Sequence, residues 1–155
     1  MKIIKNIIKT VTIVTVASVG ATAVFSKVFQ SKPIAQKIDY MSDKKGHVKF
    51  NVLLTGGAKY IKSDDFEYAE LKCRFGGMEV YFDEATLHEG KGLVCIDSSY
   101  GGVELYVPKD WKVVNDINVA MGAVEFMNEP VGENPNKELR LIGNVSLGAV
   151  EIRYV

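Results

Sequence analysis

A five-residue signature recurs five times in the C-terminal two-thirds of this chain. Each copy begins with a hydrophobic or small residue, continues with Gly and then Gly or Ala, and ends with an apolar and a charged residue. The five copies are residues 55–59, 75–79, 100–104, 121–125 and 147–151. Their first glycines lie 20, 25, 21 and 26 residues apart, and repetition at roughly 20 to 50 residues is typical of solenoids and arrays. Repetition therefore constrains the fold more than any other feature, and it argues against an enzyme.

Strand signals dominate from Val48 onward, where runs of β-branched and aromatic residues are separated by Gly, Asn, Asp and Pro. After the signature glycines the residues alternate, with Met78 and Val80 on one side and Glu79 and Tyr81 on the other. This alternation is typical of half-buried strands. Stacked copies would share one core, and their small residues would let successive turns approach closely. We therefore predict an all-β fold, a single-stranded β-solenoid of about five rungs. A sandwich of hairpins would explain the strands but not the five equivalent signatures.

The N-terminal part has a different composition. An uncharged run from Thr10 to Ser26 lies between Lys9 and Lys27, and its length reaches the lower limit for crossing a bilayer. We predict one N-terminal transmembrane helix in a membrane anchor, a polar linker and a β domain, over residues 1–29, 30–47 and 48–155. A cleaved signal peptide is the alternative, because residues 21–23 fit a small-x-small cleavage pattern. Lysines are nearly balanced on the two flanks, so the prediction is a single-pass protein of the cell membrane without an assigned orientation.

Charge and chemistry exclude several classes of function. The 19 basic and 19 acidic residues give a formal net charge of zero, which argues against a nucleic-acid partner. Cys73 and Cys95 are too few for a disulfide scaffold or a four-cysteine zinc site. We expect two free, partly buried thiols, and a disulfide remains the alternative in an oxidising compartment. His88 has no second histidine at metal-ligand spacing, and the chain has no nucleophile elbow, phosphate loop or dinucleotide fingerprint. We therefore predict no enzymatic activity, no cofactor and no metal.

One row of acidic residues is the sharpest candidate site. Four copies carry a glutamate at the same position, and stacking in register would bring these carboxylates to about 4.8 Å spacing. Such a row is either solvated and paired with nearby cations, or a docking strip for a cationic partner or a divalent ion. With two adjacent tyrosines, it makes up the candidate partner-binding strip: Glu79, Glu104, Glu125, Glu151, Tyr81 and Tyr106.

The signatures resemble a known family. Residues 75–83, residues 100–108 with Trp111, and residues 148–152 are similar to the LiaF-like C-terminal domain of cell-wall-active antibiotic response proteins, and the resemblance covers roughly 48–155. It implies a β-solenoid-like domain, membrane association and no catalysis. In better-known members the domain belongs to a membrane protein that restrains a histidine-kinase system sensing envelope stress. Those members carry several membrane segments, whereas one is predicted here.

These observations lead to two hypotheses of function. The first is a non-enzymatic, membrane-anchored protein-interaction domain in the cell-envelope stress response or its regulation, with a membrane signalling protein such as a sensor kinase as partner. The alternative is a structural or adhesive envelope module that self-associates or binds cell-wall polymer. Solenoid ends expose strand edges, and residues 150–155 carry no polar cap. This predicts homo-oligomers that form end to end through that segment.

Overall fold

The computed structural model describes residues 37–39, 46–128, 130 and 132–155. The described part is built from strands, which confirms the predicted all-β class. The strands are β1 (Lys37–Asp39), β2 (His47–Leu53), β3 (Gly56–Tyr60), β4 (Ser63–Phe66), β5 (Tyr68–Arg74), β6 (Gly77–Tyr81), β7 (Ala85–Leu87), β8 (Lys91–Ser99), β9 (Gly102–Val107), β10 (Trp111–Met127) and β11 (Asn134–Tyr154). The predicted N-terminal helix lies outside the described residues. Within them, no helix has both the length and the apolar character needed to cross a membrane.

The main sheet is parallel and has the order β1-β3-β6-β9-β11-β8-β5-β2, with β10 paired along β11. β11 joins both halves of this sheet, because its residues 138–146 pair with β8 and its residues 149–154 pair with β9. We call a strand before a signature glycine, together with the strand after it, a rung. The rungs are β2/β3, β5/β6 and β8/β9, while β10 and β11 are each one long strand that forms a whole rung. β4 and β7 form a separate two-stranded sheet.

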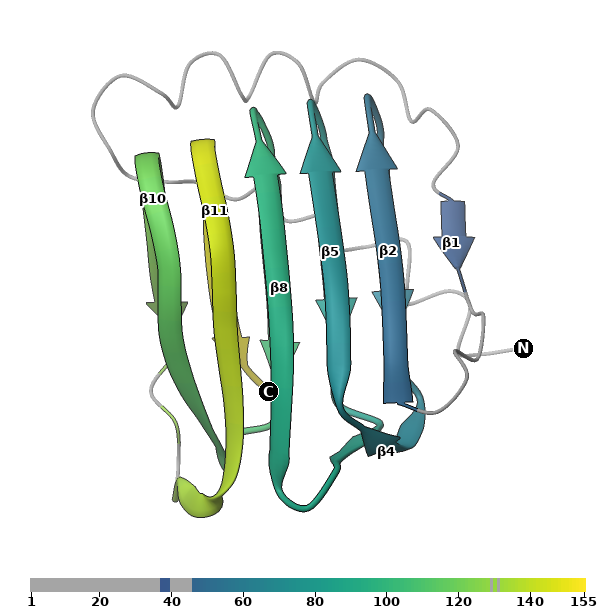
Figure 1. The fold of residues 1–155 in the computed structure, drawn as a ribbon, viewed down its shortest axis with the longest axis vertical. Helices are drawn as coiled ribbons and strands as arrows, with labels where there is room; N and C mark the ends of the chain where they lie inside the picture. Colours follow the sequence, from purple (N-terminus) through teal and green to yellow (C-terminus); the bar gives the residue numbers. More distant parts are fainter. Residues whose placement is uncertain (1–36, 40–45, 129, 131) are drawn as a thin grey trace. The chain divides into compact units, whose positions relative to one another are not determined.

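The rungs do not all stack in chain order. β11 lies between β8/β9 and β10, so the last rung of the sequence is inside the stack and the fourth rung is at its end (Figure 1). The prediction that residues 150–155 form an uncapped edge is therefore wrong. The physical reason that β11 and not β10 lies inside the stack is the polarity of the two strands at paired positions. Asn115 of β10 is exposed opposite Leu141 of β11, which is fully buried. A strand with neighbours on both sides has to be the more apolar one.

The glycines of the signature permit close stacking. A Cβ atom on Gly76 would lie 2.0 Å from the carbonyl oxygen of Thr55, and one on Gly148 would lie 2.2 Å from that of Gly101. When the five signature copies are aligned with one another, Gly56 is equivalent to Gly76. In the sheet the first copy is shifted by one residue, because Gly56 pairs with Gly77 and Thr55 takes the glycine position. Thr55 follows β2, the terminal strand of the sheet. A side chain is therefore tolerated there, while the later rungs need glycine.

The core follows the alternation read from the sequence. Met78, Val80, Val103 and Leu105 point inward and are nearly inaccessible to solvent. Both cysteines are free, as expected, with Cys73 buried and Cys95 partly buried. Burial raises the pKa of the Cys73 thiol to about 11, which keeps it protonated and unreactive.

Candidate functional site

The four glutamates of the candidate strip stack in register, as predicted. Glu79 pairs with Glu104, Glu104 with Glu151, and Glu151 with Glu125. The order in space therefore differs from the order in the sequence, because β11 lies inside the stack. Two residues further along, a second row runs parallel to the carboxylates; it consists of Tyr60, Tyr81, Tyr106 and Arg153.

The second row provides hydrogen bonds to the carboxylates. The Tyr81 hydroxyl donates to Glu79 Oε2 at 2.7 Å, and the Tyr106 hydroxyl donates to Glu104 Oε2 at the same distance. The tyrosine rings stack along the row: the centroids of Tyr81 and Tyr106 are 4.3 Å apart, with 10° between the ring planes. Arg153 replaces tyrosine on β11 and forms ion pairs with Glu104 and Glu151.

The strip is more buried than an open docking surface. Glu104 is 3% exposed and Glu151 is 2% exposed, while Glu79 is partly buried. Burial raises the pKa of all three carboxyls, opposed by the tyrosine hydrogen bonds and by the charge of Arg153. Tyrosine hydroxyls and one guanidinium already contact these oxygens. The geometry thus favours a structural role for this row, and its role in partner binding stays a prediction.

Sequence reasoning missed another row of residues, which is apolar and lies on the corner where each rung turns at its glycine. Leu54, Phe75, Tyr100 and Leu147 all have positive φ, between 52° and 56°. Met121 of β10 pairs with Ser146, directly before Leu147. We call these five residues the corner ridge. Their exposure ranges from 37% to 67%, and the rings of Phe75 and Tyr100 stack with centroids 4.9 Å apart. The signal was present in the sequence, since four of the five residues hold the first position of a signature copy.

Hydrogen bonds between rungs hold the ridge residues next to one another. The amide of Leu54 donates to the carbonyl of Arg74, that of Phe75 to Ser99, and that of Tyr100 to Ser146, all at 3.0 to 3.1 Å. Each acceptor residue comes directly before a ridge residue of the neighbouring rung in the sequence. The apolar side chains therefore form one continuous row across neighbouring rungs rather than isolated surface residues.

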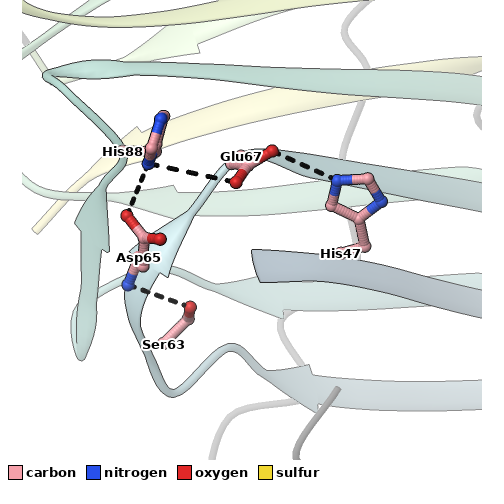
Figure 2. A network of polar contacts seen from close by, with 5 residues as sticks. All are labelled: His47, Ser63, Asp65, Glu67 and His88. Carbon is pink, nitrogen blue, oxygen red and sulfur yellow. Dashed lines mark hydrogen bonds and ion pairs between the residues drawn. The ribbon is translucent and has the colours of Figure 1, made fainter. Parts of the chain in front are cut away.

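A third cluster lies where the rungs begin (Figure 2). His88 Nδ1 is 2.7 Å from Asp65 Oδ1 and 3.9 Å from Glu67 Oε1, while Glu67 Oε2 is 3.3 Å from His47 Nε2. The hydrogen bond with Asp65 raises the pKa of His88. Both histidines of the chain take part. Sequence spacing did not predict this cluster, because its members come from segments that only the fold brings together.

A protein-family model matches this chain. The model described as "Cell wall-active antibiotics response LiaF, C-terminal" matches residues 55–152, which is more than half of the chain. Comparisons with curated proteins and with solved structures gave no significant match. The matched range contains the candidate strip and nearly all of the corner ridge. The chain therefore belongs to the LiaF-like family, named for the response to antibiotics that act on the cell wall.

Proposed function

We propose that this chain is a non-enzymatic, membrane-anchored β-solenoid domain that binds a protein partner in the cell-envelope stress response. Family membership supports the cellular role. The uncharged run from Thr10 to Ser26 supports the membrane anchor. A membrane signalling protein such as a sensor kinase fits this role as partner. The observation that carries the proposal is the corner ridge, which supports a docking surface for such a protein.

The corner ridge is unfavourable for the isolated fold in two ways. Bulky residues with positive φ are conformational outliers, and each costs on the order of 1–2 kcal/mol relative to the usual backbone region. Their apolar side chains also remain in water, where a contiguous patch marks an interaction site. Gly or Asn would satisfy the same backbone without either penalty. Leu54, Phe75, Tyr100 and Leu147 at these positions, with exposed Met121 beside them, instead match the aromatic and apolar composition of interface cores.

The double substitution Phe75→Asn and Tyr100→Asn tests this proposal. Asparagine tolerates positive φ, so relief of the backbone strain offsets the lost ring stacking, and we expect the unfolding free energy to be no lower than that of the unsubstituted chain. We expect the same variant to leave the response to a cell-wall-active antibiotic switched on without the antibiotic, as release of a restrained kinase would, measured with a transcriptional reporter. Val155→Asn is the matched control, because Val155 is 50% exposed but lies off the corner ridge. A normal response from a folded double variant would contradict the proposal.

Self-association is a second candidate function, and the β10 edge favours it. Among the described strands, β10 pairs with β11 alone, and Val119 and Phe126 at inward positions are 40% and 45% exposed. A long edge strand with unpaired backbone groups can pair with another chain. On this view the chain is a structural module of the envelope that oligomerises end to end through β10.

Light scattering at increasing protein concentration tests this second function. If β10 pairs between copies, the full chain should form concentration-dependent oligomers, and the double substitution Val119→Lys and Phe126→Lys should keep it monomeric. A chain that stays monomeric at high concentration without these substitutions would rule out pairing through β10. Oligomers that persist in the lysine variant would locate the interface elsewhere.

A further inference from the structure

We infer that Asp65, Glu67 and His88 form a binding site for a divalent transition cation of the Zn²⁺ type. The three potential ligand atoms, one from each residue, all lie within 4.8 Å of one another. One imidazole nitrogen and two carboxylate oxygens are ligands that zinc accepts. The two carboxylates also match the charge of a divalent ion. Neither the family membership nor the proposed partner-binding function depends on this site.

Strand geometry makes the three side chains converge. Phe66 and Leu87 are register partners in the β4–β7 sheet and are both buried. Asp65 and Glu67 flank Phe66, and His88 follows Leu87, so all three lie on the opposite, solvent-facing side. The amide of His88 donates to the carbonyl of Phe66 at 2.8 Å. The imidazole of His88 lies beside both carboxylates, as Figure 2 shows.

Ligand separations are close to those that a metal needs. Tetrahedral zinc with bonds of about 2.0 to 2.1 Å places its ligand atoms about 3.3 Å apart. The two distances from His88 Nδ1, 2.7 Å to Asp65 and 3.9 Å to Glu67, bracket that value. Small rotations of exposed carboxylates would therefore suffice, with water completing the coordination.

Surrounding groups orient the carboxylates. The Asp65 amide donates a hydrogen bond to Ser63 Oγ at 3.2 Å. Gly46, with φ of 70°, packs so closely that a Cβ atom there would lie 2.0 Å from the Asp65 carbonyl oxygen. The Glu67 amide donates to the Gly46 carbonyl at 3.0 Å. His47 is thereby held against the second oxygen of Glu67, the position of a residue that orients a metal ligand.

Calorimetric titration of the full, metal-stripped chain with zinc chloride tests the inference, with magnesium chloride as the comparison. We expect one zinc ion per chain, no comparable magnesium binding, and a zinc-dependent rise in melting temperature. His88→Asn and Glu67→Gln should each abolish this binding, while His47→Gln should weaken it by about tenfold through the orientation of Glu67.

Two controls make the result specific. Glu84→Gln changes a nearby exposed carboxylate that pairs with Lys62 instead of the cluster, and should leave zinc binding unchanged. Cys95→Ser should also leave it unchanged, which excludes binding through the partly buried thiol. Absence of zinc binding, or zinc binding that survives both His88→Asn and Glu67→Gln, would overturn the inference. The network would then be a set of ion pairs that join the starts of the rungs.

Discussion

Replacing Gly148 with alanine should destabilise the domain by about 3 kcal/mol or more, at the upper end of the range for overpacking. The new methyl group would lie 2.2 Å from the carbonyl oxygen of Gly101. That carbonyl accepts the amide of Ala149 at 3.2 Å, and strands pair with β11 on both sides. The clash therefore cannot be relieved without moving several rungs. Urea unfolding followed by circular dichroism measures the change.

Gly56→Ala is the matched control. The added Cβ atom would find its nearest neighbour, the Gly77 carbonyl oxygen, at 3.9 Å. We therefore expect a change within about 0.5 kcal/mol. Alignment of the five signature copies makes Gly56 the equivalent of Gly76, whereas the sheet register pairs Gly56 with Gly77. Equal destabilisation by Gly56→Ala and Gly148→Ala would contradict this register.

The second large effect is expected at Arg153. Its guanidinium pairs with Glu104 and Glu151, two carboxylates whose side chains are almost fully buried. Arg153→Gln would leave both without a cation, and removing one partner of a buried ion pair typically costs about 3–5 kcal/mol. We expect a loss near the lower end of that range, because the Arg153 side chain is itself 27% exposed. Chemical unfolding near neutral pH measures it.

The same strip predicts how stability depends on pH. Burial raises the pKa of Glu79, Glu104 and Glu151 in the folded state, so between the unfolded and folded pKa values the native protein binds more protons. The contribution of these groups to the unfolding free energy therefore falls as pH rises through their folded pKa. Burial and the carboxylates also raise the pKa of Tyr81 and Tyr106, which keeps both hydroxyls protonated as donors.

Arg153→Gln should accordingly be most damaging near neutral pH and partly rescued by acidification toward the pKa of an ordinary glutamate. Adding Glu151→Gln to Arg153→Gln should recover part of the loss at neutral pH, since it removes one unpaired charge. Glu125, at the end of the same row, remains in both variants. A loss that is constant across this pH range would show that Arg153 acts through packing alone.

Local features of this fold could be predicted from the sequence. Alternation around Met78 and Glu79 correctly indicates which side of each strand is buried, and the repeated glutamate position correctly predicts the in-register row. Both depend on period-two geometry and on repetition, which a single sequence displays directly. The membrane helix predicted from the N-terminal run lies outside the described residues and stays a prediction.

Long-range placement could not be predicted in the same way. The signature is equally good in β10 and β11, so the exchange of their order depends on residues outside it, such as Asn115 opposite Leu141. The cluster of His47, Glu67 and His88 likewise depends on which segments the sheet brings together. The corner ridge was visible as a pattern, but its positive φ and its exposure appear only once the turns are built.

In-cell photo-crosslinking tests the central claim, that the corner ridge docks a protein partner, most directly. A benzophenone amino acid would replace Phe75 on the corner ridge or, as a control, Lys49, whose side chain is 75% exposed on β2. We predict an adduct with an identified envelope-stress signalling protein from position 75 and not from position 49. Adding Tyr100→Asn should abolish that adduct. Equal adducts from both positions, or an adduct from position 75 that persists with Tyr100→Asn, would contradict the claim.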